Sequence, residues 1–308
     1  MPTVANNNWA EPALWAKAVM YTGHALRSER DSWLYPFWSA LALEFLARTA
    51  LASVSPTLLA DTSTADISNL LYALGKATSS SNVKSIGTAD VLARCEKLFP
   101  GFTGEHKKFC AGFTAHRNDE LHSGGMPFAT LKTQTWLPRY YEACKALLVA
   151  MNRDLSHLFG PEAAAAEKMI AALHDDAAKQ VRQAISARRT IWEEKSTQEK
   201  EAAKKAAQVA ASRNLGHVVE CPACKCKALV TGEEISQQPP AIEGNSVAVR
   251  STMLPTAFEC TGCGLKIRGH NQLHASELGD TYVSTVHWDP IDYYAHLDDD
   301  GPEPDNNE

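Results

Sequence analysis

The chain of 308 residues lacks the long uninterrupted apolar run of a membrane span, and no stretch of it approaches roughly eighteen such residues. Its first residues, MPTVANNNWAEP, have neither the basic region nor the apolar core of a signal peptide. Polybasic runs, which are typical of nucleic-acid binding, are absent as well. The sequence therefore predicts a cytoplasmic protein with no membrane partner, in which any contact with RNA comes from a local cluster of charges.

Charge is unevenly distributed along the chain. The formal net charge is −6, from 30 Lys and Arg against 36 Asp and Glu. Residues 1–160 carry 15 basic and 13 acidic residues, residues 161–219 carry 10 and 8, and residues 220–308 carry 5 and 15. The acidity therefore belongs to the C-terminal part. A hydrophobic content of 44% is that of a soluble globular protein, and the length is sufficient for two domains.

Residues 1–160 have a helical pattern throughout and predict a mainly α fold with four or five helices in one bundle. In the most apolar segment, Glu44 and Arg48 are four residues apart in the order that favours a helical ion pair. Glu44 is either a partly buried structural partner of Arg48 or a group that supports an active site. The expected helices are Ser32–Leu59, Asn69–Leu74, Ala89–Leu98, Phe102–Leu121 and Trp136–Met151.

Residues 161–213 are rich in Ala, Lys, Glu and Gln, and neither proline nor glycine occurs between Pro161 and Gly216. A thin apolar stripe that includes Val181, Ile185 and Trp192 runs along this segment. We expect a long helical arm, which would span roughly 75 Å as one helix. The stripe would serve either docking within the chain or a two-chain coiled coil.

Five of the eight cysteines lie between residues 221 and 263. Cys221 and Cys224 form one CxxC pair, Cys260 and Cys263 form another, and 35 residues with short β-like runs separate the two pairs. Four thiolates in this pattern are typical of a structural zinc site, and a filled set of four leaves no position for a catalytic water. Residues 214–288 therefore predict a small β-rich zinc ribbon that holds one zinc ion, with no catalytic metal.

Two alternatives remain for these cysteines. Cys226 makes the first motif CPACKC and allows another choice of ligand, and a redox dithiol is the other reading. The expected strands are Ala228–Thr231, Val247–Thr252, Ala257–Glu259 and Leu265–Ile267. Residues 289–308 contain eight acids and no Lys or Arg, which predicts an acidic and largely disordered tail.

The segment Arg117-Asn118-Asp119-Glu120-Leu121-His122 places a permanent cation and a titratable imidazole at the end of a predicted helix, just before Ser-Gly-Gly. On an ideal helix, Arg117 and His122 lie roughly 140° apart, whereas Asn118 and His122 lie almost above one another. Asn118 is therefore the natural orienter of the imidazole. The structural alternative is an ion pair between Arg117 and Glu120, with His122 at the negative end of the helix dipole.

These residues, in an all-helical first half, resemble the HEPN domains, a family of small helical bundles. Their signature is an arginine, usually followed by a polar residue, and a histidine after four to six intervening positions, which Arg117, Asn118 and His122 match. The resemblance covers about half of the chain and does not include the zinc ribbon. It implies a metal-independent endoribonuclease of bacterial toxin or antiviral defence type, whose site forms across a homodimer.

On this hypothesis, His122 acts as general base or acid, Arg117 holds the scissile phosphate, and Asn118 orients His122 or contacts phosphate, with Glu44 and Glu120 as supporting residues. The products would be a 2′,3′-cyclic phosphate and a 5′-hydroxyl. The ribbon or the acidic tail would then bind a regulatory protein partner. The alternative is a non-catalytic HEPN and zinc-ribbon adaptor that dimerises and binds a protein or a nucleotide.

Overall fold

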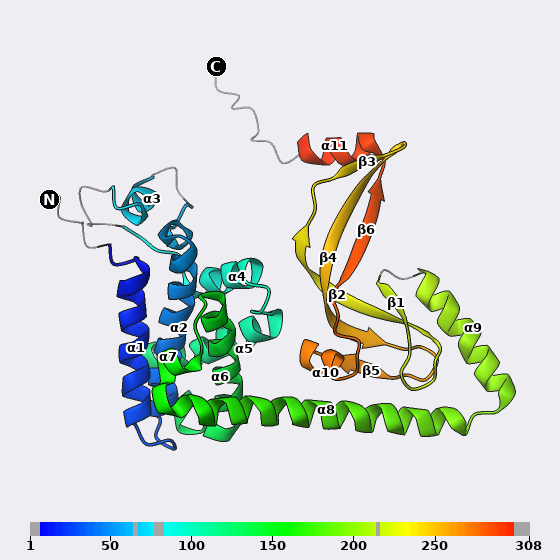
Figure 1. Cartoon of the computed structure of the whole chain (residues 1–308), viewed down its shortest axis with the longest axis horizontal. Coiled ribbons are helices and arrows are strands. Elements are labelled where there is room, and N and C mark those ends of the chain that lie inside the picture. The colour runs from blue at the N-terminus through cyan, green and yellow to red at the C-terminus, as the bar shows by residue number, and fades with distance from the viewer. Residues whose placement is uncertain (1–6, 64–66, 77–82, 214–215, 299–308) are drawn as a thin grey trace. The chain divides into compact units, whose positions relative to one another are not determined.

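The computed structural model describes residues 7–63, 67–76, 83–213 and 216–298. The protein is mainly helical, with an antiparallel sheet in its C-terminal part (Figure 1). Two compact units divide the chain, the first over residues 1–173 and the second over residues 174–308. The predicted combination of a helical first half and a β-rich cysteine region is confirmed at this level.

Unit 1 is a bundle of helices around one apolar core. Its helices are α1 (Glu11–Arg27), α2 (Leu34–Val54), α3 (Ser68–Ala73), α4 (Thr88–Leu98), α5 (Gly104–His122), α6 (Thr133–Ala150) and α7 (Leu155–Phe159), followed by the start of α8 (Ala163–Glu193). Short 3₁₀ turns occur at η1 (Pro56–Leu59), η2 (Pro127–Ala129) and η3 (Gly160–Glu162).

Helix α2 is the centre of this bundle and contacts α1, α4, α5 and α6. Its sequence is apolar on all sides, and such a helix is stable in water only when other elements cover it. By length and composition alone α2 could cross a membrane, but 61% of its most apolar window is buried within the unit. Leu43, Leu46 and Leu51 are almost completely buried, as expected of a core helix in a bundle.

Helix α5 positions the RNDELH segment. It begins with a capping box, in which the Thr103 side chain accepts from the backbone N–H of His106 and the Thr103 N–H donates to His106 Nδ1 at 3.0 Å. Cys110, Phe113 and Thr114 are buried against the bundle, and Phe113 stacks on Trp136 of α6 with ring centroids 4.9 Å apart. The helix ends at His122, one residue beyond the predicted end, so roughly the last one and a half turns of α5 carry the whole motif.

The predicted arm is not one continuous helix. Helix α8 ends at Glu193, and α9 (Thr197–Arg213) begins after a break at residues 194–196. The break contains another capping box, because the Ser196 N–H donates to Glu199 Oε2 at 2.8 Å and the Glu199 N–H donates to Ser196 Oγ at 3.3 Å. The side chains of Val181, Ile185 and Trp192 pack into the core of unit 2, so the apolar stripe docks within the chain.

Unit 2 contains an antiparallel sheet in which the long strand β4 pairs with β2, β3, β5 and β6, and β1 pairs with β2. The strands are β1 (His217–Glu220), β2 (Lys227–Gln237), β3 (Ala241–Glu243), β4 (Ser246–Glu259), β5 (Lys266–Arg268) and β6 (Tyr282–Trp288), and a short helix α10 (His270–His274) follows β5. Two of the expected strands, Val247–Thr252 and Ala257–Glu259, are parts of β4.

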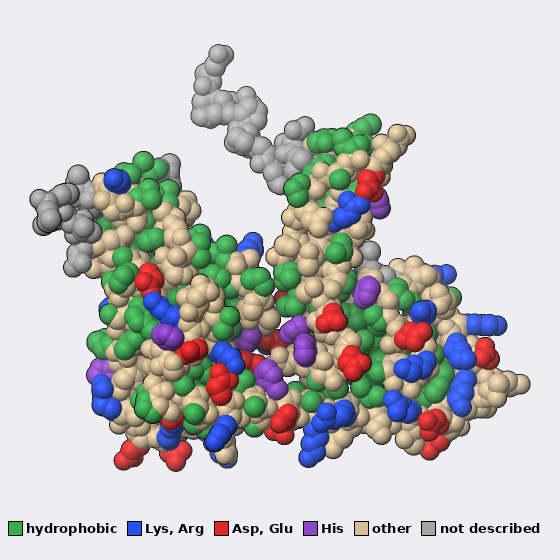
Figure 2. Space-filling view, viewed as in Figure 1, with side chains coloured by type: hydrophobic (Ala, Val, Ile, Leu, Met, Phe, Trp, Pro, Cys, Tyr) green, Lys and Arg blue, Asp and Glu red, His purple; other side chains and the backbone are tan. Residues whose placement is uncertain are grey.

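The acidic tail departs from its prediction in the part that the structure describes. Residues 290–298 form helix α11 (Pro290–Asp298), whose first turn includes Asp292, whereas residues 299–308 lie outside the described residues. The run from Asp289 to Tyr294 favours a helix because Asp289 Oδ1 accepts the N–H of Ile291 at 2.8 Å and Pro290 fits the first helical position. Figure 2 shows hydrophobic side chains over the end of the sheet where α11 lies, and Ile291 is 80% exposed there.

Candidate functional site

The two CxxC motifs fold into two turns with the same backbone hydrogen bonds. In the first, the Cys221 N–H donates to the Cys226 carbonyl and the Lys225 N–H donates to the Cys221 carbonyl, both at 2.9 Å. In the second, the Cys260 N–H donates to the Leu265 carbonyl at 2.9 Å and the Gly264 N–H donates to the Cys260 carbonyl at 2.8 Å. Each turn thus aims two thiols in one direction.

The four thiols of these turns meet in one buried cluster. Cys221, Cys224, Cys260 and Cys263 are at most 7% exposed, and their sulfur atoms all lie within 4.8 Å of one another. The Cys221 and Cys263 sulfurs are 3.6 Å apart, and the Cys224 and Cys260 sulfurs are 3.5 Å apart. Sulfurs around a tetrahedral ion with bonds of about 2.3 Å are separated by roughly 3.8 Å. The cluster can therefore hold one metal ion.

Cys226 lies outside the four-sulfur set, as predicted. It is buried, and a Cβ added at Gly262 would stand 2.9 Å from the Cys226 sulfur. Gly262 is therefore needed to make room for Cys226. Gly264, with φ +71°, has a left-handed backbone conformation that glycine adopts at lower cost than other residues.

Basic side chains from the end of α8 and the break after it donate to backbone carbonyls of both cysteine turns. Arg189 Nη2 donates to the Pro222 carbonyl at 3.1 Å, Lys195 Nζ donates to the Gly262 carbonyl at 3.3 Å, and Arg188 Nη1 donates to the Cys263 carbonyl at 3.5 Å. Four thiolates around a divalent ion carry a net charge of −2, which these cations would partly balance. No local pattern in the sequence predicts this contact beyond the basic residues themselves.

The other three cysteines belong to the apolar core of unit 1. Burial raises the pKa of Cys95 to about 12 and also raises the pKa values of Cys110 and Cys144. Buried thiols with raised pKa values are protonated near neutral pH and are poor nucleophiles. These residues are structural.

The second candidate site is the Arg117 cluster, made of Glu44 and Arg48 on α2 and Arg117 on α5. Glu44 Oε2 accepts from Arg117 Nη2 at 2.5 Å, and Glu44 Oε1 accepts from Arg48 Nη2 at 3.1 Å. The side chains are 11% exposed for Glu44 and 13% for each arginine. Arg48 also donates to Ser85 Oγ and to the Ile86 carbonyl. Glu44 therefore joins α2 to the end of α5.

The Arg117 cluster has one more positive than negative charge, since two guanidinium groups share one carboxylate. Arg117 Nε is buried and has no hydrogen-bond partner in the described part of the chain. A buried donor without a partner costs free energy unless water or a ligand satisfies it. An anion near the cluster would offset its excess positive charge.

Glu120 does not supply the second carboxylate for Arg117. Its Oε2 accepts the backbone N–H of Phe128 at 3.5 Å, which ties the end of α5 to the η2 turn. The ion pair between Arg117 and Glu120, expected on the structural alternative, is thus replaced by the pair with Glu44. Sequence reasoning found Glu44 and Arg48 by their spacing, but nothing local showed that Arg117 would join them.

Asn118 and His122 lie on the exposed face of α5, while the Arg117 side chain is mostly buried. This is the geometry expected of residues four and five apart on one helix. The structure describes neither a hydrogen bond between Asn118 and His122 nor a contact of His122 with the Arg117 cluster. One copy of the motif therefore brings together Arg117 and Glu44 and leaves the imidazole free at the surface.

Comparisons with known proteins add no relative. No protein family, no curated protein and no solved structure was found that matches this chain.

Proposed function

We propose that unit 1 is a metal-independent endoribonuclease of the HEPN type, with Arg117, Asn118 and His122 as its catalytic residues. The observation that carries this proposal is the Arg117 cluster, which has an excess positive charge and an unpartnered Arg117 Nε at the end of a helix whose final residue is an exposed histidine. A phosphodiester is the kind of anion that such a cluster would stabilise.

In the proposed reaction, the 2′-oxygen of the ribose attacks the adjacent phosphorus and the bond from phosphorus to the 5′-oxygen breaks. His122 accepts the proton of the 2′-hydroxyl or donates a proton to the leaving 5′-oxygen, since an imidazole nitrogen can take up or release a proton. Arg117 stabilises the negative charge that develops on the phosphate oxygens, and Glu44 holds its guanidinium in place. The products are a 2′,3′-cyclic phosphate and a 5′-hydroxyl.

A homodimer would solve the geometric problem that one copy poses. His122 faces outward and Arg117 faces inward on the same helix, so one α5 presents them roughly 140° apart. Two α5 ends that meet across a two-fold axis would place the imidazole of each copy near the arginine of the other. The proposed nuclease therefore depends on a dimer in which the ends of α5 face each other.

The four-cysteine cluster is proposed to hold one structural zinc ion. Four thiolates in tetrahedral reach of one another suit zinc, and all four coordination positions are filled by protein. The ion would cross-link the two cysteine turns and supply no water for hydrolysis. A role in bacterial toxin or antiviral defence systems follows only from the resemblance of the RNDELH segment to the HEPN family.

A second candidate function is favoured by the burial of Arg117. Its guanidinium already pairs with Glu44 and its side chain is only 13% exposed, as in a structural ion pair. A helical unit held together in this way could serve as a non-catalytic adaptor that dimerises and binds a protein or a nucleotide. His122 would then only end α5, where a cation is favourable.

Cleavage of RNA by purified full-length protein separates the two candidates. We expect single-stranded or structured RNA to be cut in the presence of EDTA, with 2′,3′-cyclic phosphate ends, and RNA with a 2′-deoxy residue at the cut position to resist. His122→Ala and Arg117→Gln should each lower the rate by about 100-fold or more, because each removes a catalytic group. Zinc content must be measured in parallel, because EDTA can also strip the cysteine cluster.

His116→Ala is the matched control, because His116 is another exposed histidine of α5 and packs near Phe128 instead of the Arg117 cluster. It should cut RNA as wild type does. Equal cleavage by wild type, His122→Ala and Arg117→Gln would overturn the site. A folded dimer that cuts none of the RNAs would support the adaptor.

A further inference from the structure

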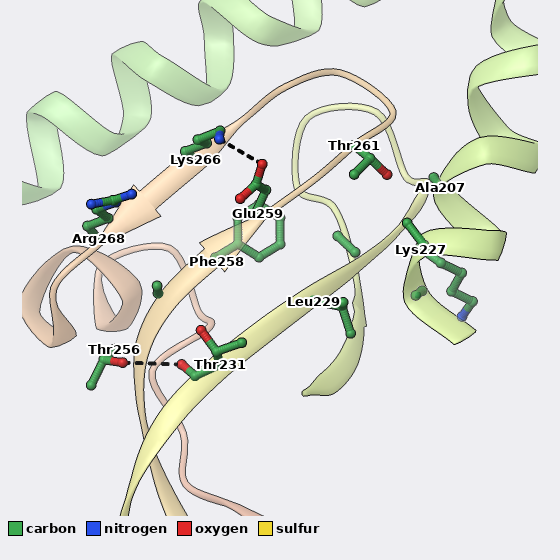
Figure 3. Close-up of a pocket in the computed structure, with 14 residues that line it drawn as sticks. Ala207, Lys227, Leu229, Thr231, Thr256, Phe258, Glu259, Thr261, Lys266 and Arg268 are labelled. Atoms are coloured by element: carbon green, nitrogen blue, oxygen red, sulfur yellow. Dashed lines mark hydrogen bonds and ion pairs between the residues drawn. The ribbon is translucent and has the colours of Figure 1, made fainter. Parts of the chain in front are cut away.

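Unit 2 contains a pocket of about 530 Å³ that neither proposed site uses. Its walls are the alanine face of α9 and one face of the sheet (Figure 3). Ala207, Ala210 and Ala211 form the helix wall, and their short side chains leave the space open. Pockets of this volume are of the size that binds small molecules or short peptide segments.

Most of the sheet wall is built from residues that alternate with the core of unit 2, and the core residues Ala228 and Phe258 also line the pocket. On β2, Leu229 faces the pocket between the buried Ala228 and Val230, and on β5 the exposed Lys266 and Arg268 flank the buried Ile267. The strand register forms two rows across β2, β4 and β5. One row is Leu229, Glu259 and Lys266, and the other is Thr231, Ala257 and Arg268. These residues therefore form one continuous surface across three strands.

Positive charge gathers at this pocket within an acidic part of the chain. Residues 220–308 contain five basic residues, and three of them, Lys227, Lys266 and Arg268, line the pocket. The one acidic residue in the lining is Glu259, which pairs with Lys266 at 2.7 Å. Lys227 and Arg268 are exposed, and neither has an ion pair or a side-chain hydrogen bond among the described residues. Three cations and one carboxylate leave the pocket with +2.

The cations stand at two ends with an apolar centre between them. Figure 3 shows Lys266 and Arg268 at one end, Lys227 at the other beside α9, and Leu229 between them. Strands lie about 4.8 Å apart and rise about 3.4 Å per residue, so the Cα atoms of Lys227 and the two β5 cations are separated by roughly 12 to 17 Å. A ligand that fits must carry negative charge at both ends and a small apolar group in the middle.

We propose that this pocket binds an extended acidic peptide in which two carboxylate residues four positions apart bracket a small aliphatic residue. In an extended chain the first, third and fifth side chains point to one face, and the first and fifth are about 13 Å apart. The two carboxylates reach Lys227 and the Lys266 and Arg268 end, and the central side chain packs on Leu229 and Ala257. The proposal is independent of the nuclease.

An RNA strand fits the same pocket less well. Bound single strands usually stack bases on exposed aromatic rings, and the only ring in the described lining, Phe258, is 1% exposed. The surrounding segment also has five basic residues against fifteen acidic ones, which repels a long polyanion more than it repels a peptide with two charges.

The test uses zinc-loaded full-length protein and a set of labelled pentapeptides. The peptides have Asp or Glu at the first and fifth positions and Ser at the second and fourth. The third position is Ala, Val or Leu. Fluorescence anisotropy should show binding of at least one peptide, with weaker binding at higher salt. Matched peptides with Asn and Gln in place of the acids should not bind. Lys227→Gln combined with Arg268→Gln should weaken binding by about tenfold or more.

Lys205→Gln is the control variant, since Lys205 is an exposed lysine of α9 that does not line the pocket. It should bind as wild type does, and all variants should keep their zinc. Absence of binding by every peptide, or equal binding of the neutral peptides, would overturn the proposal. An oligouridylate that displaces the peptides, and that binds more weakly to the Lys227→Gln and Arg268→Gln double variant, would also overturn the proposal. The pocket would then be an RNA site. None of these binding measurements depends on RNA cleavage.

Discussion

The two units are stabilised in different ways. The core of unit 1 is a large set of apolar side chains from several helices, with the Arg117 cluster as a polar contact between α2 and α5. The core of unit 2 is smaller and has the cysteines at its centre, packed with Phe258, Leu265 and Trp192. Burial of apolar area stabilises a helical bundle by itself, whereas a small core usually needs a cross-link. We therefore expect unit 1 to fold without any ligand and unit 2 to depend on the metal ion that is proposed for its cysteine cluster.

Removal of a metal ligand should have the largest effect. Binding of structural zinc contributes on the order of 10 kcal/mol to the folding of small domains. Cys260→Ser should therefore abolish zinc binding and unfold unit 2, while the helices of unit 1 persist. Limited proteolysis with bound zinc measured in parallel checks this, because unit 2 should be digested and residues of unit 1 should resist.

Cys226→Ser is the matched control, because it changes a buried thiol of the same turn that lies outside the four-sulfur set. It should retain one zinc per chain. If unit 2 of the Cys260→Ser protein resisted protease without zinc, unit 2 would fold without a metal, as unit 1 is expected to do.

The second effect concerns the polar contact in unit 1. Glu44→Gln would leave the guanidinium groups of Arg48 and Arg117 without a carboxylate in a mostly buried place, which costs about 3 to 5 kcal/mol. Arg117→Gln should cost less, about 1 to 2 kcal/mol, because Glu44 keeps Arg48. Urea unfolding followed by helical circular dichroism gives both values.

This order of effects distinguishes a shared network from two separate pairs. If Arg117→Gln destabilised unit 1 as much as Glu44→Gln does, the ion pair with Arg48 would not be enough to stabilise the buried Glu44 carboxylate. Zinc content should stay unchanged in both variants, since the network lies wholly in unit 1.

Local patterns in the sequence were enough to predict much of this difference between the units. The spacing of Cys221, Cys224, Cys260 and Cys263 predicted the four-cysteine cluster, because each turn is a local structure with fixed geometry. The ends of α5 were predicted within about two residues, since the Ser-Gly-Gly stop is also local. By contrast, the pair between Glu44 and Arg117 joins residues 73 apart, and only the packing of α2 against α5 brings them together.

The errors also have physical causes. A continuous arm was expected over residues 161–213 because neither proline nor glycine interrupts it, but Ser196-Thr-Gln-Glu199 is a capping-box sequence that starts a new helix. Strand β6 was missed although Tyr282–Trp288 is rich in the aromatic and β-branched residues that favour strands, and its partner is β4. The pocket was not predicted because its cations are spread over two strands, β2 and β5, and become neighbours only through the strand register.

The smallest expected effect compares the two cysteine turns within unit 2. Both need a positive φ at the residue after the second cysteine, where φ is +61° at Lys225 and +71° at Gly264. A residue with a Cβ pays about 1 to 2 kcal/mol for this conformation, while glycine loses about 0.5 to 1 kcal/mol more chain entropy on folding. Lys225→Gly should therefore stabilise the zinc-bound unit by about 0.5 to 1 kcal/mol.

Gly264→Ala should lower the stability of the zinc-bound unit, whereas Lys225→Gly should raise it. The nearest side-chain atom to an added Cβ at Gly264 is Arg188 Nη1 at 3.5 Å, an ordinary contact, so the cost comes from the backbone alone. Competition for zinc with a chromogenic chelator should show apparent affinity rising about two- to fivefold in Lys225→Gly and falling by a similar factor in Gly264→Ala. Equal affinities in both variants would mean that the ion, and not the backbone of the turns, determines the stability of the cluster.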